Sequence, residues 1–84
     1  NTTIIDTDFH HIYYPDGTQN ELTAPIRIGN KVWIGCNTTI LKGVTIGDNA
    51  VIGANTLVNR DVPPNCLAVG NPMRIIQEGI DWEA

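Results

Sequence analysis

The stretch from 26 to 63, IRIGNKVWIGCNTTILKGVTIGDNAVIGANTLVNRDVP, carries a branched aliphatic residue at every sixth position of one phase. These positions are Ile28, Ile34, Ile40, Ile46, Ile52 and Val58. An α-helix returns a side chain to one face about every 3.6 residues and a flat strand every second residue, so one continuous element does not explain the period. A fixed internal repeat sets the architecture of the whole chain. We therefore expect short strands joined by bends.

A second lane of small or β-branched residues lies two places before the aliphatic positions, and it extends one period further, to Val62: Ile26, Val32, Thr38, Val44, Ala50, Thr56 and Val62. Residues two apart on a strand point to the same face, so both lanes are predicted to face inward. Glycine follows the aliphatic residue at four of six steps, and Leu41 and Asn59 follow it at the other two. We predict that these steps form the bends, with glycine and asparagine supplying a positive φ.

We call the residue that follows each aliphatic position the step residue. The order of step residues, two glycines and then another residue, repeats every 18 positions, and aligning 28–45 with 46–63 gives seven identities. Three sides of six residues then make one coil. The sequence predicts an all-β triangular solenoid, with coils stacked about 4.8 Å apart around an aliphatic core. A β-sandwich of many short strands is the alternative, but its strands do not keep one period over more than thirty residues.

Four segments resemble the hexapeptide-repeat acyltransferases, and they are most similar to the galactoside, maltose and capsular-sugar O-acetyltransferase branch: 28–35, 44–54, 61–65 and 70–76. The resemblance covers about residues 3–77 and implies a left-handed parallel β-helix. It also implies acetyl-CoA as acyl donor, a sugar-like hydroxylated acceptor, no required metal, and a homotrimer with active sites between subunits.

The chain is expected to form one domain, 1–84, which we interpret as the C-terminal part of a longer β-helix. Residues 11–25 break the period and contain the turn signature Tyr13-Tyr14-Pro15-Asp16-Gly17, so they are predicted to form an extruded active-site loop. Residues 71–84 are predicted to form a tail or short helix that covers the open end.

Composition argues against two classes of partner. The net charge of −4, with only five Lys and Arg, disfavours a nucleic acid or a general membrane-surface role. The apolar runs are too short to span a membrane. Cys36 and Cys66 do not form a metal-type pair, and we predict two reduced thiols in a cytoplasmic protein.

His10 is the candidate general base. Alternation along a strand would place Asp6, Asp8 and His10 on one side, where Asp8 could orient the imidazole. A solvated loop histidine is the alternative interpretation of the residues alone. The resemblance implies that His10 takes a proton from the acceptor hydroxyl, which attacks the thioester directly. His11 is assigned to structure or to contact with the acceptor.

The resemblance also implies a groove for the acyl donor, lined by Trp33, Gly35, Cys36, Ala54, Asn59, Arg60 and Arg74. The alternatives are a subunit contact for Trp33 and a structural role for Arg74, which would tie the tail to the coil. Asn59-Arg60 departs from the commoner Thr-Lys of the family, and Cys36 stands where a serine is frequent. A backbone amide near Gly35-Cys36 is the candidate donor to the oxyanion. Lys31, Lys42, Arg60 and Arg74 are expected to form a cationic strip suited to a polyanionic donor.

Two other functions remain open from the sequence. One is a non-catalytic or regulatory β-solenoid fragment. The other is a γ-type carbonic anhydrase, which requires three well-separated histidines, whereas this chain has two adjacent ones, His10 and His11. The sequence does not name the acceptor or the acyl chain preferred.

Overall fold

Short β-strands and tight corners build the computed structural model, which describes residues 2–5, 15–19 and 23–83. No helix occurs within these residues, so none of them forms a membrane-spanning helix. The strands are β1 (Thr2–Ile4), β2 (Arg27–Ile28), β3 (Trp33–Ile34), β4 (Thr38–Ile40), β5 (Thr45–Ile46), β6 (Val51–Ile52), β7 (Leu57–Val58), β8 (Cys66–Val69) and β9 (Arg74–Glu78).

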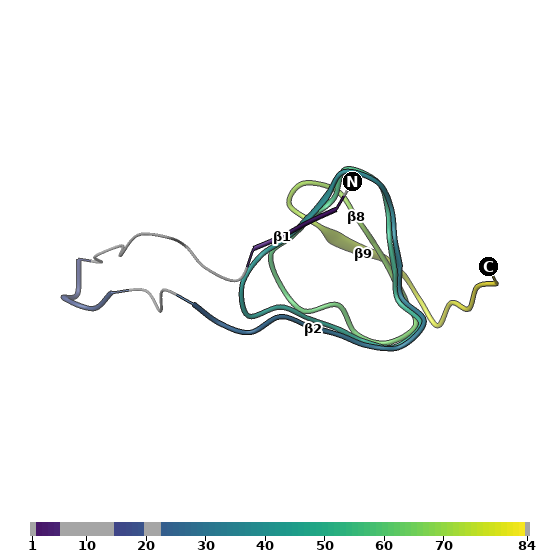
Figure 1. The fold of residues 1–84 in the computed structure, drawn as a ribbon, viewed down its shortest axis with the longest axis horizontal. Coiled ribbons are helices and arrows are strands. Elements are labelled where there is room, and N and C mark those ends of the chain that lie inside the picture. The colour runs from purple at the N-terminus through teal and green to yellow at the C-terminus, as the bar shows by residue number, and fades with distance from the viewer. Residues whose placement is uncertain (1, 6–14, 20–22, 84) are drawn as a thin grey trace.

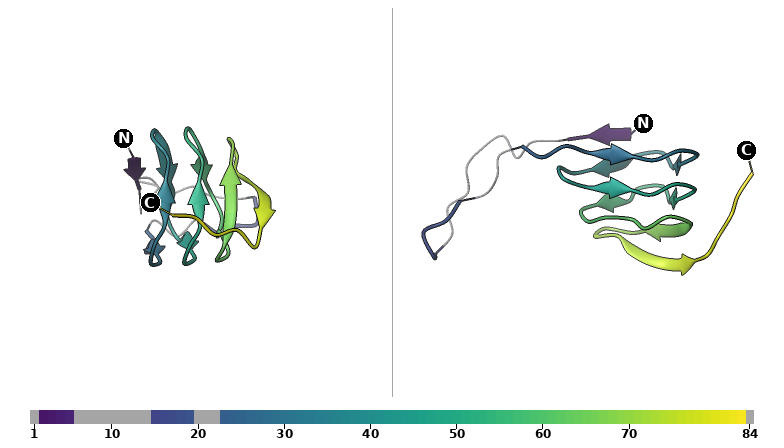
Figure 2. Two further views of the ribbon diagram at one scale, coloured as in Figure 1. Left: turned by 90° about the vertical axis from the view of Figure 1, so that its right-hand side faces the viewer. Right: turned by 90° about the horizontal axis from the view of Figure 1, so that it is seen from below.

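The strands form three sheets that lie on the three sides of a triangular outline (Figure 1). Their orders are β1-β4-β7, β2-β5 and β3-β6-β8-β9, and every pairing is parallel except that of β8 with β9. Figure 2 shows the successive turns of the chain stacked side by side. The predicted all-β architecture of stacked parallel strands is confirmed.

The register of the strands gives the length of a coil. Ile28 pairs with Ile46 and Trp33 with Val51, which is an offset of 18 positions in each case (46 − 28 and 51 − 33). The predicted coil length is therefore confirmed over the first two coils. Backbone N–H groups of one coil donate to carbonyls of the next, as from Gly29 to Ile46 at 2.8 Å.

Both predicted lanes face the core wherever a coil lies on each side. The buried set includes Ile40, Val44, Ile46, Ala50, Ile52, Val58 and Val62, together with Thr38 and Thr56. Ile28 is 40 % exposed, because it belongs to the first described coil and no described strand lies above it in its sheet. The aliphatic side chains fill a narrow core at native density, and the two threonines are the members of this buried set whose hydroxyls need hydrogen-bond partners.

The bends are made differently from the prediction. The step glycines do not adopt a positive φ. The residue three places after the aliphatic position does so after Ile28, Ile34, Ile40, Ile46 and Ile52, and again after Val62, but not after Val58. The residues in this left-handed conformation are Lys31 (φ 55°), Asn37 (58°), Gly43 (74°), Asn49 (66°), Asn55 (60°) and Asn65 (58°). Asparagine predominates there because its short polar side chain tolerates this region better than most residues.

Close stacking of the coils explains why four steps are glycine. A Cβ placed on Gly35 would lie 2.6 Å from the Ala54 nitrogen, and one on Gly47 would lie 2.5 Å from the Pro64 nitrogen. Separations this short are not found for real Cβ atoms, and the obstacle is the backbone of the next coil. Glycine is therefore required by contact between coils, and the freedom of its φ is not used.

The third coil is shorter than the first two. Val62 bridges to Ile46, and Leu67 pairs with Val51, so the offset falls to 16 positions (62 − 46 and 67 − 51). Val62 thus continues the lane of Ile46, and its predicted place in the second lane is wrong. Asn65, three residues later, takes the left-handed corner conformation accordingly.

The end of the stack is closed by a strand and a methionine. Of the two forms predicted for 71–84, a tail or a short helix, the helix is not found among the described residues. β9 turns back and pairs antiparallel with β8, which covers the edge of that sheet. Met73 is 2 % exposed and donates its N–H to the Leu57 carbonyl. Its unbranched side chain fills the end of the core.

An insertion separates β1 from the coils. Thr2 pairs with Thr38, although two coil lengths separate these residues in the sequence, so the insertion adds the equivalent of one whole coil. Within this insertion, residues 15–19 lie away from the stack (Figure 1). They form a turn in which Gly17 has φ 89° and the Thr18 hydroxyl donates to Asp16 Oδ1 at 2.6 Å. This bond is the main cause of a lowered pKa at Asp16.

We predict that Gly47→Ala lowers the free energy of unfolding by about 1–3 kcal/mol, the usual cost of forcing an extra carbon into a close-packed contact. Asn59→Ala is the matched control, because Asn59 follows Val58 at the corresponding step but already carries a Cβ and is exposed. Its effect is expected to stay within about 0.5 kcal/mol. Equal urea midpoints for the two variants would contradict the contact explanation.

Candidate functional site

Three of the predicted donor-binding residues lie in one column at the corner between the β3-β6-β8-β9 sheet and the β1-β4-β7 sheet. Gly35 and Cys36 form the first layer and Ala54 the second, with the Asn55 N–H donating to the Cys36 carbonyl at 2.9 Å. Cys36 and Ala54 are exposed. We call these three residues the Cys36 column.

Buried hydroxyls hold this corner from inside. Thr38 Oγ1 donates to the Gly35 carbonyl at 2.9 Å, and Thr56 Oγ1 donates to the Gly53 carbonyl at 2.6 Å. Both threonines are at most 1 % exposed. A buried hydroxyl that satisfies a corner carbonyl fixes that peptide, so the backbone of the column is held rigidly. The sequence placed both threonines inward but did not reveal this role.

The structure distinguishes between the two backbone amides, of Gly35 and of Cys36, that are predicted to donate to the oxyanion. The Gly35 N–H already donates to the Ile52 carbonyl at 2.8 Å within the ladder between coils. An amide committed to a ladder bond does not serve a developing oxyanion without breaking that bond. Of the predicted pair, the Cys36 amide is therefore the candidate that remains.

Two cations and an amide side chain lie around the end of β7. Arg60 Nη2 donates to the Met73 carbonyl at 3.5 Å, and Arg74 follows Met73 at the start of β9. Asn59, Arg60 and Arg74 are all exposed. Leu57 connects this region to the column, because its N–H donates to the Gly70 carbonyl beside the Cys36 corner. All the predicted donor-binding residues except Trp33 thus lie near one or the other end of β7.

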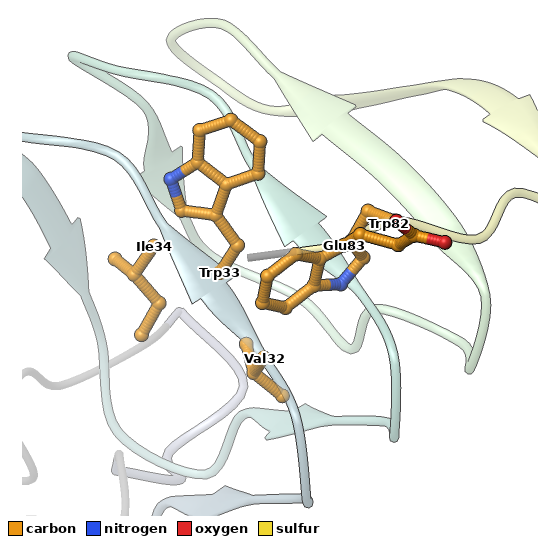
Figure 3. Close-up of a pocket in the computed structure, with 5 residues that line it drawn as sticks. All are labelled: Val32, Trp33, Ile34, Trp82 and Glu83. Atoms are coloured by element: carbon orange, nitrogen blue, oxygen red, sulfur yellow. The ribbon is translucent and has the colours of Figure 1, made fainter.

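Trp33 lies in β3, at the first-coil edge of the sheet whose last strand, β9, begins at Arg74. It is 53 % exposed, and its ring centroid is 5.7 Å from that of Trp82, with the planes tilted by 50°. Both indoles line a groove of about 430 Å³ together with Val32, Ile34 and Glu83 (Figure 3). The groove walls are mainly apolar, as expected for a small-molecule site.

The predicted cationic strip is only partly assembled. Lys42 and Arg60 occupy the same place on successive coils, because one coil length separates them in the sequence. Lys31 lies at another corner, between β2 and β3, where its Nζ is 3.3 Å from Asp81 Oδ1. Its inclusion in the strip is wrong, because Lys42 and Arg60 follow β4 and β7 and therefore lie at a different corner of the triangle.

Both cysteines are free thiols, as predicted. Cys36 is exposed, whereas Cys66 is 2 % exposed. Burial, and then the Glu78 carboxylate, raise the pKa of the Cys66 thiol above its ordinary value. Thiol chemistry at neutral pH is therefore expected at Cys36.

The catalytic candidates Asp8 and His10, and the neighbouring His11, lie outside the described residues. Their assignments remain predictions.

Trp82 was missed by the sequence interpretation, which left it in a generic tail. Two features of the sequence could have indicated that Trp82 has a role at a site. The chain contains only two tryptophans, and an acidic residue, Asp81, directly precedes this one.

Comparison with known proteins agrees with this geometry. A family model described as bacterial transferase hexapeptide (six repeats) matches residues 25–60, the region of the regular coils. The chain is 59 % identical over 69 residues to galactoside O-acetyltransferase of Escherichia coli strain K12. It belongs to the hexapeptide-repeat acetyltransferase family.

Solved structures of two acetyltransferases superpose on nearly the whole chain. The polySia-specific acetyltransferase NeuO matches with a TM-score of 0.93 and 36 % identity over 99 % of this chain. A galactoside acetyltransferase in complex with coenzyme A matches with a TM-score of 0.78 and 38 % identity over 100 % of it. The chain covers 33 % of the Escherichia coli relative, and 39 % and 48 % of these two structures.

Proposed function

We propose that the protein transfers an acetyl group from acetyl-CoA to a hydroxyl group of a sugar-like acceptor. The observation that carries this proposal is the Cys36 column: an exposed corner whose backbone is rigid, with an accessible thiol side chain and two arginines near one end of the adjoining side. A relative with coenzyme A bound, at 38 % identity, supports the same donor.

The residues of the column suit the neutral part of the donor. Cys36 and Ala54 are small and exposed, and glycine at position 35 allows the two layers to approach closely. A thioester-bearing arm can therefore lie against the corner. Arg60 and Arg74 would meet the phosphates, because guanidinium groups form charge-assisted bonds to phosphate oxygens.

In the chemistry we propose, His10 accepts the proton of the acceptor hydroxyl as its oxygen attacks the thioester carbonyl. The carbonyl π electrons move to oxygen, where the Cys36 amide would donate to the oxyanion. Collapse of the tetrahedral intermediate breaks the carbon–sulfur bond, and the thiol of coenzyme A leaves with a proton returned from His10. Asp8 would hold the imidazole in the required orientation.

We further infer a left-handed sense of winding, a homotrimer and a cytoplasmic location. The resemblance implies the first two, and the half-exposed Ile76 offers apolar surface that a subunit contact could cover. The two free thiols support a reducing compartment.

The proposed function predicts release of coenzyme A thiol when the protein is mixed with acetyl-CoA and a panel of sugars. His10→Ala is expected to lower kcat by about 10²–10⁴-fold, the usual contribution of a general base. His11→Ala is the matched control and is expected to cause a much smaller loss of kcat. Equal turnover by the parent and His10→Ala would overturn the assignment of the base. Acetyl-CoA binding without turnover against any acceptor would favour a non-catalytic role for the coils.

We predict that Arg74→Ala raises the KM for acetyl-CoA by about tenfold, equivalent to about 1.4 kcal/mol, through loss of a phosphate contact. Arg27→Ala removes the same charge from exposed β2, in the β2-β5 sheet, and serves as control. Steady-state kinetics at a fixed acceptor concentration compare the two. An unchanged KM in Arg74→Ala would assign that arginine to structure.

A further inference from the structure

The last residues of the described chain run back across the coils. Gly79, with φ 69°, turns the chain after β9, and the Ile80 N–H donates to the Asn65 carbonyl at 2.9 Å in the third coil. Figure 2 shows this tail continuing along the stack to the level of the first coil. We call residues 79–83 the strap.

The strap is tied to the first coil by one lysine. Lys31 Nζ lies 3.3 Å from Asp81 Oδ1 and 5.3 Å from the centroid of the Trp82 ring. The backbone N–H of Trp82 and then Lys31 lower the pKa of Asp81, so its carboxylate is charged at neutral pH. A single ammonium group therefore contacts both a carboxylate and an aromatic face.

The strap brings Trp82 to Trp33. The centroid separation of 5.7 Å and tilt of 50° lie in the range of favourable aromatic pairs. The Trp82 Nε1 is buried and forms no hydrogen bond within the described part of the chain, so the contact relies on the ring and not on the indole N–H. Trp33 stays half exposed, and hence Trp82 covers one part of it and leaves the rest accessible.

The groove beside Trp33 depends on this arrangement. Trp82 and Glu83 come from the strap, whereas Val32, Trp33 and Ile34 come from the first coil (Figure 3). Removal of the Trp82 ring would leave Trp33 as an isolated indole on an open surface. An indole with fewer neighbours samples more rotamers and presents a less defined wall.

We propose that Trp82 is a positioning residue, which the strap carries across the coils to orient Trp33 and to form the second wall of a groove for the apolar arm of the acyl donor. The ligand assignment rests on the proposed function. The orientation of Trp33 by Trp82 does not, and it can be measured without turnover.

The first test is spectroscopic and uses the fact that the chain has only two tryptophans. In Trp82→Phe and Trp82→Ala, Trp33 is the sole tryptophan, and excitation at the long-wavelength edge of the indole band avoids Tyr13 and Tyr14. Acrylamide quenching of Trp33 is expected to be up to about twofold stronger in Trp82→Ala, since Trp33 loses its aromatic cover only there. Equal quenching in the two variants would overturn the proposal.

The contact between Lys31 and the strap is tested in the parent by far-ultraviolet circular dichroism, where the strong transitions of two neighbouring indoles give an exciton-coupled signal. Asp81→Asn is expected to weaken this signal, and Glu83→Gln, which removes a charge from the same strap without touching the Lys31 pair, is expected to keep it. Absence of the coupled signal in the parent would show that the strap does not dock.

The second test is kinetic. Trp82→Ala is expected to raise the KM for acetyl-CoA about three- to tenfold with kcat nearly unchanged, the pattern of lost uniform binding. Trp82→Phe is expected to stay close to the parent. Equal KM values for these two variants would overturn the role in donor binding. Absence of turnover in the parent, with the difference in quenching intact, would instead reject the proposed function and leave the positioning of Trp33 standing.

Discussion

The backbone hydrogen bonds between successive coils fix the positions of the core side chains and of the candidate site. The N–H groups of Gly29, Gly35 and Gly47 each donate at 2.8 Å to a carbonyl in the next coil. These short bonds bring the backbones of two coils into contact at the corners. A Cβ on the step residue therefore has no room where that residue faces the next coil. The same ladder keeps the aliphatic lanes in register, so the core is a stack of equivalent side chains.

The candidate site follows from that ladder. Cys36 lies directly beside Ala54, its counterpart one coil later, and buried Thr38 fixes the corner peptide of Gly35. The shortening of the third coil allows residues 70–74 to cross the end of β7. This crossing brings the Met73 carbonyl to Arg60, with Arg74 next along the chain. Groups that belong to separate motifs in the sequence thereby share one side of the solenoid.

Much of the fold could be predicted because the period is encoded in side chains that face the core. Ile40, Ile46 and Ile52 are buried as their spacing indicates. The cause of the glycines could not be read in the same way, because the clash partner, such as Pro64 for Gly47, depends on how tightly two coils stack. The position of Lys31 away from Arg60 likewise depends on the triangular cross-section. The end of the chain followed no period, so neither the pairing of β9 with β8 nor the approach of Trp82 to Trp33 could be foreseen.

The central claim is that the exposed corner at Cys36 receives the acyl donor, and alkylation of that thiol with and without acetyl-CoA tests it directly. Cys66 is buried and serves as the internal control for unfolding. At an acetyl-CoA concentration ten times its Kd, the rate at Cys36 is expected to fall about tenfold, because only the unliganded fraction reacts. An unchanged rate at Cys36, at a concentration that supports full turnover, would contradict the account.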